Sequence, residues 1–325
     1  MAIEYMIDSD VTISSEGAFS VPSKLFSSYM NLVSDDTCQI ELIKNDSVQI
    51  KTESGVTKIK GINAEEFPVI PNIKEELSLT LKGSIVRKSI EKTLFSSAEG
   101  NIRPTLAGLL VNISEKEVTF ASTDSFRLSE YKTHLDTPID KSFSQIIPSK
   151  TSYEIKGIIK DDDMVKIISG ENQIAFFCGN AKIYSRLLNG KFPDYSNFFP
   201  KSYATKAVIN RVDLIQALRK INLISKENNY SIKMSMSSET GILLETSETQ
   251  IGEGEVKLTG SVEGEDNIIG VNSTYFLEAL GVMDSTHIAL SFENPLAPIM
   301  VLPVDDDKKK KDTSEFKHII MPLKI

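Results

Sequence analysis

The chain has 325 residues, of which 40% are apolar and 25% charged, and its formal net charge is −9. This composition is ordinary for a globular protein, and the length allows two or three domains with substantial cores. No apolar run reaches the roughly 18 residues of a membrane-spanning helix, and the N-terminus lacks the basic and apolar regions of a secretory signal. We therefore expect a cytoplasmic protein without a membrane partner, in which Cys38 and Cys178 remain free thiols.

Amphipathic helices and short strands follow one another in three sets. The first set enters in mid-strand at Ala2–Tyr5 and continues with a helix near 19–33 and strands within 39–52. In the second, helices are expected near 81–97 and 145–160, with strands within 108–123, 125–135, 163–178 and 181–188. The third has helices near 209–225 and 268–283 and strands within 231–246 and 287–303. Each complete set has two helices and some eight strands, which predicts an α+β fold with helices packed on antiparallel sheets.

The sets are copies of one unit with a period of about 125 residues. Phe67-Pro68 returns as Phe192-Pro193, and a pattern of strand, cap and helix recurs around Pro22, Pro148 and Asn272. This tandem repeat predicts three domains, with boundaries at 1–77, 78–202 and 203–325. The helix near residue 84 recurs near residue 212, so its first copy would precede Met1, and we expect domain one to lack about 45 N-terminal residues.

Positive charge is concentrated on the predicted helices. The net charge argues against a nucleic-acid partner, because phosphate affinity comes from lysine and arginine. Acidic residues, however, lie mostly in turns and strand ends such as Asp35-Asp36, Glu75-Glu76 and 161–163. The basic residues of the helices are Lys82, Arg87, Lys88, Lys92, Lys150, Lys156, Lys160, Arg211, Arg219 and Lys220. Apolar helix positions would pack on the sheets and leave these side chains on the opposite face.

The sequence contains no recognisable catalytic constellation. Residues 122–125 place hydroxyls beside a carboxylate, but His134, His287 and His318 share no motif with them, so a turn between strands is the better interpretation. No Cys or His pair has metal-ligand spacing, and no glycine-rich phosphate loop follows a strand. We expect no cofactor, no metal and no enzymatic activity. An unrelated enzyme built from repeated α+β domains is the alternative that these absences disfavour.

Several segments, in this order and spacing, closely resemble the bacterial DNA sliding clamp family, the β subunit of DNA polymerase III: EEFPVIPN, LLVNISEKEVTFASTDSFRLSEY, SRLLNGKFPDYSNFFP, VNSTYFLEAL, FENPLAPIMVLP and IIMPLKI. The resemblance covers essentially the whole chain. It implies a ring of two chains, each a tandem repeat of DNA-clamp domains, that encircles double-stranded DNA as a processivity factor. The basic helix residues would then face the DNA without reading its sequence. The implied partners are the replicative polymerase, the clamp loader and other proteins with clamp-binding motifs.

The resemblance also implies a hydrophobic pocket for partner peptides between the second and third domains. Matched residue by residue, it comprises Leu106, Thr123, Ser125, Phe126, Arg127, Leu128, Pro193, Asn197, Phe198, Asn272, Tyr275, Leu296, Pro298, Ile319, Ile320, Met321, Pro322, Leu323 and Lys324. Apolar side chains would form the concavity, while Arg127, Asn272 and Tyr275 would orient the peptide. The chain departs from the family's commoner Thr-Asp-Gly-His-Arg-Leu pattern, because Ser125 and Phe126 replace the glycine and histidine.

A homodimer interface is implied as well. In the family, domain one pairs edge to edge with domain three of the partner, which would bring Thr57 and Ile59 against Leu223 and Ile224. An incomplete domain one would leave sheet edge and core uncovered. The alternative is therefore a truncated, clamp-like monomer that binds partner peptides but cannot encircle DNA.

Overall fold

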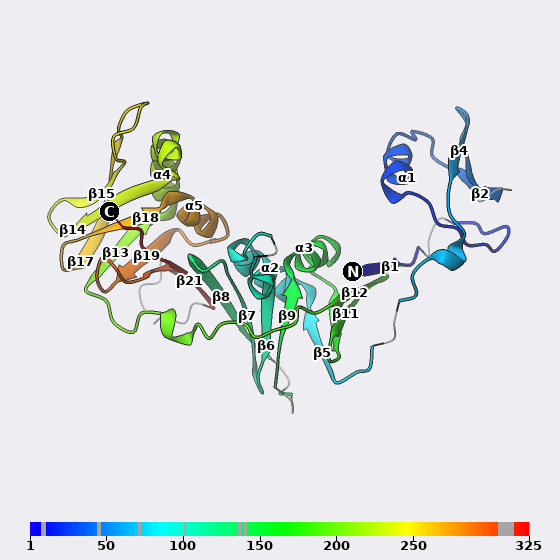
Figure 1. The fold of residues 1–325 in the computed structure, drawn as a ribbon, viewed down its shortest axis with the longest axis horizontal. Helices are drawn as coiled ribbons and strands as arrows, with labels where there is room; N and C mark the ends of the chain where they lie inside the picture. Colours follow the sequence, from blue (N-terminus) through cyan, green and yellow to red (C-terminus); the bar gives the residue numbers. More distant parts are fainter. Residues whose placement is uncertain are drawn as a thin grey trace. The chain divides into compact units, whose positions relative to one another are not determined.

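The computed structural model describes residues 1–7, 11–43, 47–70, 73–100, 102–135, 138–139, 142–304 and 315–324. The chain divides into two compact units (Figure 1). The larger unit consists of Met1–Tyr5 and Ile73–Ile325, and the smaller unit of Met6–Asn72. Within the larger unit we call residues 78–202 the middle repeat and residues 203–325 the last repeat.

The middle repeat packs two helices, α2 (Gly83–Thr93) and α3 (Ser149–Ile158), on antiparallel strands. Its strands are β5 (Leu77–Lys82), β6 (Gly108–Ile113), β7 (Glu117–Thr123), β8 (Arg127–His134), β9 (Phe143–Pro148), β10 (Met164–Ser169), β11 (Gln173–Cys178) and β12 (Ala181–Arg186). Val86 and Ile90, four residues apart on α2, are buried, as the helical pattern predicts. Gly83 begins α2 where the chain passes Lys160, and a Cβ atom there would lie 1.9 Å from the Lys160 carbonyl oxygen, so only glycine fits.

The last repeat also packs two helices on antiparallel strands. Its helices are α4 (Arg211–Ser225) and α5 (Ser273–Gly281), and its strands are β13 (Thr205–Asn210), β14 (Ser231–Ser237), β15 (Gly241–Glu245), β16 (Glu255–Leu258), β17 (Gly260–Gly264), β18 (Asn267–Asn272), β19 (His287–Phe292), β20 (Ile299–Val304) and β21 (Phe316–Ile320). Both helices start at an asparagine whose side-chain oxygen accepts from backbone N–H groups of the first turn, Asn210 for α4 and Asn272 for α5. The predicted α+β fold is confirmed.

Strand pairing joins the repeats into shared sheets. One sheet has the order β17-β13-β19-β20-β21-β8-β7-β6-β9, so it runs from the last repeat into the middle repeat through the pair β21 and β8. A second sheet, β1-β12-β11-β10-β5, adds β1 (Ala2–Tyr5) to the middle repeat by the same kind of antiparallel pair, β1 with β12. The last repeat also contains the sheet β16-β15-β14-β18.

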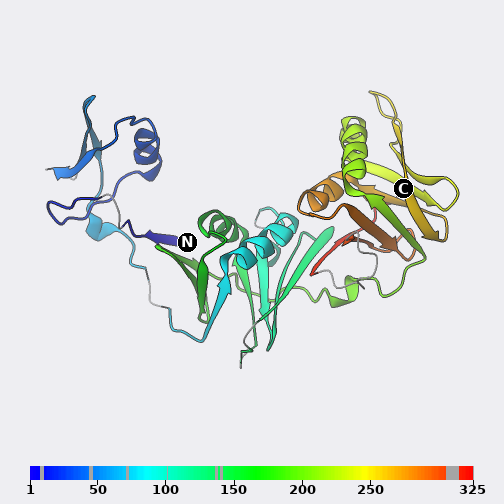
Figure 2. The same cartoon turned by 180° about the vertical axis from the view of Figure 1, so that it is seen from behind.

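The helices of the larger unit lie on one side of its sheets. Figures 1 and 2 show α2 and α3 next to each other, on the same side as α5 and α4. The pairs α2 with α3 and α4 with α5 are in contact. No helix among the described residues is long and apolar enough to cross a membrane.

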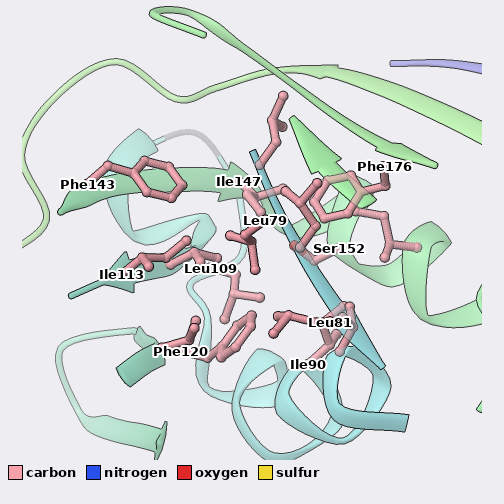
Figure 3. A pocket seen from close by; sticks show the side chains of 16 residues that line it. Leu79, Leu81, Ile90, Leu109, Ile113, Phe120, Phe143, Ile147, Ser152 and Phe176 are labelled. Atoms are coloured by element: carbon pink, nitrogen blue, oxygen red, sulfur yellow. The ribbon is translucent and has the colours of Figure 1, made fainter. Parts of the chain in front are cut away.

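The core of the middle repeat encloses a small apolar cavity. Side chains from the strands and from α2 point into it, among them Leu79, Leu109 and Ile90 (Figure 3). Its volume is about 20 Å³, enough for about one water molecule. Ser152 is its one polar lining residue, and the Ser152 hydroxyl donates to the Pro148 carbonyl. The other walls are apolar and offer a water no hydrogen bonds, so we interpret the cavity as an imperfection of packing.

In its described residues, the smaller unit has a three-stranded sheet and one α-helix. Its elements are α1 (Ser23–Met30), β2 (Gln39–Ile43), β3 (Ser47–Lys51) and β4 (Val56–Lys60), followed by a short 3₁₀ turn at Ala64–Glu66, and the strand order is β2-β3-β4. Val48, Ile50 and Ile59 form its core, against which Phe26 and Tyr29 pack.

Candidate functional site

The junction between the middle and last repeats is built on the pair β8 and β21. Ile320 lies opposite Arg127, and Phe316 lies opposite Tyr131. Beyond β21 the chain stays attached at two further points, because the Met321 amide donates to the Phe126 carbonyl at 2.8 Å and the Leu323 amide to the Gly270 carbonyl at 2.8 Å. The C-terminal segment therefore touches both repeats, as the predicted pocket requires.

Arg127 connects the two repeats at this junction. Its Nε donates to Asp124 Oδ2 at 3.0 Å, and its two terminal nitrogens donate to Glu278 Oε2 at 2.5 Å and to the Phe95 carbonyl at 2.8 Å. The guanidinium also lies over the Tyr275 ring, 4.5 Å from its centroid. Arg127 is 8% exposed. The prediction that Arg127 orients a peptide is therefore corrected, since its charge is satisfied within the junction and it ties β8 to α5.

The other pocket candidates separate by exposure. Phe126, Phe198 and Leu296 are exposed apolar side chains, at 57%, 50% and 76%. Other members lie at the surface or half-buried: Ser125, Pro193, Asn197, Asn272, Tyr275, Pro298, Met321, Pro322, Leu323 and Lys324. Five are buried and can only support a surface from below: Leu106, Thr123, Leu128, Ile319 and Ile320. The pair β8 and β21 and its extension bring Phe126, Leu128, Ile319 and Met321 together at the junction, and the full pocket stays a prediction.

Beneath this surface lies a small apolar cluster. Leu128, Met300 and Ile319 form it, with Tyr195 and Phe199 packed against it. The Tyr195 hydroxyl donates to the buried Glu130 carboxylate at 2.9 Å, and burial raises the pKa of Tyr195 above its usual value. The NGKFPDY motif therefore anchors the segment between the repeats to the shared sheet.

The turn between β7 and β8 has an unusual backbone at Ser125, where φ is +82°. This is the left-handed region that glycine favours, which fits the glycine of the commoner family pattern. The Asp124 carboxylate accepts from the Phe126 amide at 2.8 Å and from the Arg127 amide at 3.0 Å, so the turn is held from within. Ser125 Oγ accepts a hydrogen bond from Arg103 at 2.6 Å, which puts an exposed arginine, absent from the sequence prediction, at this rim.

The predicted basic residues differ in exposure and in their partners within the fold. Six have exposed side chains on or beside α2, α3 and α4: Lys82, Lys88, Lys150, Lys160, Arg219 and Lys220. Lys156 is half-buried on α3. Arg87 pairs with Asp161 at 3.1 Å, and Arg211 donates to the carbonyls of Leu280 and Ser285, so both are partly engaged within the fold.

Lys92 is the clear correction to the DNA-facing set. Its side chain is 8% exposed, and its Nζ lies 2.8 Å from Asp284 Oδ2 and also donates to the Val282 carbonyl. The hydrogen bond from Lys92 lowers the pKa of the Asp284 carboxyl. Lys92 is thus a second cation by which the middle repeat holds the end of α5.

The predicted dimer residues also differ in exposure. Leu223 on α4 is 77% exposed, whereas Ile224 and Thr57 are half-buried. Ile59 is 4% exposed and belongs to the core of the smaller unit. Its place in the predicted interface is therefore corrected, because its side chain supports the unit's own packing.

His318 makes the junction sensitive to acid. The imidazole is fully buried beside Ser129, and burial together with the charge of Arg127 lowers its pKa to about 3. In the unfolded chain the pKa is about 6.5. Above pH 6.5 the His318 ring is neutral in both the folded and the unfolded state, so protonation takes no stability from the folded state there. Below pH 6.5 only the unfolded state binds the proton, and this contribution is lost as pH falls toward the folded pKa.

We expect the wild type to lose about 2 kcal/mol more unfolding free energy than His318→Gln between pH 7 and pH 5, since each unit of pH difference corresponds to about 1.4 kcal/mol. Urea unfolding of both proteins at the two pH values measures the difference. Parallel pH profiles for the two proteins would contradict the assignment.

The middle and last repeats are α+β units that share a sheet across their junction. Exposed lysines and arginines lie on the helices, which cover one side of the sheets. These features define a protein of the DNA-clamp class. Residues 80–194 match the family described as DNA polymerase III beta subunit, central domain, and residues 196–324 match DNA polymerase III beta subunit, C-terminal domain. The chain therefore belongs to the family of DNA polymerase III beta subunits, the bacterial sliding clamps.

Individual relatives agree. The beta sliding clamp of Bacillus subtilis is 28% identical over 300 residues, which are 91% of this chain and 79% of the relative. That of Staphylococcus epidermidis is 29% identical over 304 residues, 91% and 79% of the two chains. The crystal structure of the DNA polymerase III beta chain from Streptococcus pneumoniae, at 27% identity, superimposes with a TM-score of 0.91 and covers 99% of this chain and 86% of that one.

Proposed function

We propose that this clamp is a processivity factor of DNA replication, which encircles duplex DNA and tethers polymerase to it. Membership of the sliding clamp family supports this function. The observation that carries it for this chain is the row of exposed cations on α2, α3 and α4, which lie on one side of the shared sheets. Lysines and arginines that contact only phosphates hold DNA in any sequence and let the protein slide.

The proposal extends to partners. Phe126, whose carbonyl accepts from the Met321 amide, is an exposed apolar side chain next to the C-terminal segment, and Phe198 and Leu296 are exposed apolar side chains as well. They support binding of apolar peptide anchors from the polymerase, the clamp loader and other clamp-binding proteins. Self-association into a homodimeric ring would use the exposed Leu223. The clamp would act in the cytoplasm, where the bacterial chromosome lies, and its role is mechanical, so no catalytic residue is assigned.

Retention on circular DNA tests this function. The protein would be loaded onto nicked circular DNA with a bacterial clamp loader and ATP, then passed through gel filtration in about 0.5 M salt, where phosphate contacts weaken strongly. A protein linked to DNA by topology stays with the circle and is released when a restriction enzyme cuts it. Equal retention on circular and linear DNA, or none on either, would contradict the proposal.

A further inference from the structure

The most exposed stripe of α3 carries a tyrosine between lysines. Lys150 and Tyr153 are three residues apart and Gly157 follows one turn later, so all three share a face, and Lys160 lies just beyond the helix end. Tyr153 is 64% exposed. A Cβ atom added at Gly157 would meet nothing within 4 Å, so the space beside the ring is open.

This tyrosine has no packing role to explain it. The opposite face of α3 provides the buried side chains, Thr151, Ser152 and Ile155. Among the described residues, neither the ring contacts nor the side-chain hydrogen bonds of the protein include Tyr153. By contrast, Tyr195 and Tyr275 are both engaged in the junction.

Lysines flank Tyr153 along α3. Lys150 and Lys156 lie on the helix and Lys160 just beyond its end, and the neighbouring helix α2 is in contact with α3. Among the acids nearby, Glu154 is half-buried on α3, and three aspartates follow Lys160. Asp161 pairs with Arg87, Asp163 accepts from the Lys160 amide at 2.8 Å, and Asp162 is exposed, so these three acids lie past the end of the helix. Figures 1 and 2 place α3 on the same side as α2.

A duplex presents phosphates on its outside and keeps the faces of its bases stacked, so lysines alone suffice to hold it. An exposed aromatic ring among lysines instead fits single-stranded DNA, because unpaired bases stack on such rings in any sequence. We propose that Tyr153 is a stacking platform for an unpaired base and that α3 thereby binds single-stranded DNA. This inference rests on the proposed DNA-facing role of the helix side and adds to it a second form of DNA.

Binding of a labelled oligothymidylate and of a labelled duplex, followed by fluorescence anisotropy at low salt, tests the proposal. Tyr153→Leu should weaken oligothymidylate binding about tenfold, the scale of one lost base stack, and leave duplex binding unchanged. Tyr153→Phe keeps the ring and should bind within about twofold of the wild type. Tyr203→Leu makes the same change at a tyrosine that is 56% exposed elsewhere and should have no effect.

A second readout locates the contact. An oligonucleotide that carries iododeoxyuridine should cross-link to Tyr153 on irradiation, as mass spectrometry would show. The proposal is overturned if Tyr153→Leu binds oligothymidylate normally, if it weakens single strand and duplex equally, or if Tyr153→Phe behaves like Tyr153→Leu. Retention on circular DNA separates the stacking site from the clamp function. If Tyr153→Leu is retained normally and also binds oligothymidylate normally, only the stacking site is wrong. If the wild-type protein is not retained, the clamp function is wrong.

Discussion

Replacement of Arg127 by methionine is expected to loosen the junction between the middle and last repeats by about 3 kcal/mol, because removal of one partner from a buried ion pair leaves the other unpaired. Methionine fills similar space between the Phe95 and Tyr275 rings, so the loss reports on charge and hydrogen bonds. Asp124 keeps its two backbone donors but loses the guanidinium, and Glu278 loses its partner across the junction.

Native-state hydrogen exchange measures this effect where it occurs. The amides of Ile319 and Met321, at the pair β8 and β21 and its extension, should open roughly 150-fold more often in the variant. The double variant Asp124→Asn with Arg127→Met should recover part of the loss, since the neutral amide needs no counter-charge. Glu278→Gln, whose side chain is 47% exposed, should cost much less. Unchanged exchange in Arg127→Met would show that the junction does not depend on this arginine.

The sequence predicted the fold well because its signals are local. The spacing of Val86 and Ile90 is enough to define a helix face, and both side chains are buried on α2. The strands β16 and β17, which lie in different sheets, were not predicted, because their residues EVKLTGSVEG are exposed or half-buried and carry only a weak apolar pattern. The strand pair β1 with β12 was missed for another reason, since pairing depends on residues about 180 positions apart.

The sites were harder to predict because they depend on what packs against each helix. Lys88 and Lys92 lie on one face of α2, yet the first is exposed and the second is buried, because the last turn of α2 meets the end of α5. Lys92 and Asp284 are 192 residues apart in the sequence, and a helical wheel cannot foresee such a partner. Arg127 was assigned to the pocket by resemblance alone. A resemblance indicates where a residue lies in the fold, but it does not indicate which partners satisfy the charge of that residue.

The C-terminal segment should decide partner binding. Removal of residues 321–325 is expected to weaken binding of a polymerase-type clamp-binding peptide at least about a hundredfold, since a few central anchors dominate interfaces of this kind. The deletion removes the hydrogen bonds from Met321 to Phe126 and from Leu323 to Gly270, so the segment no longer bridges the two repeats. The strand pair β8 and β21 ends at Ile320 and should survive, which hydrogen exchange can verify.

A single substitution separates loss of the surface from loss of the fold. Phe126→Ala removes an exposed ring whose backbone carbonyl still accepts from Met321, so the junction should stay intact while peptide affinity falls about tenfold. Ile251→Ala, at a side chain 60% exposed elsewhere in the last repeat, is the matched control and should bind the peptide normally. Fluorescence anisotropy with a fluorescein-labelled peptide gives the affinities of all four proteins. If the truncated protein and Phe126→Ala bind the peptide as tightly as the wild type, the peptide docks away from the surface formed by Phe126 and the C-terminal segment.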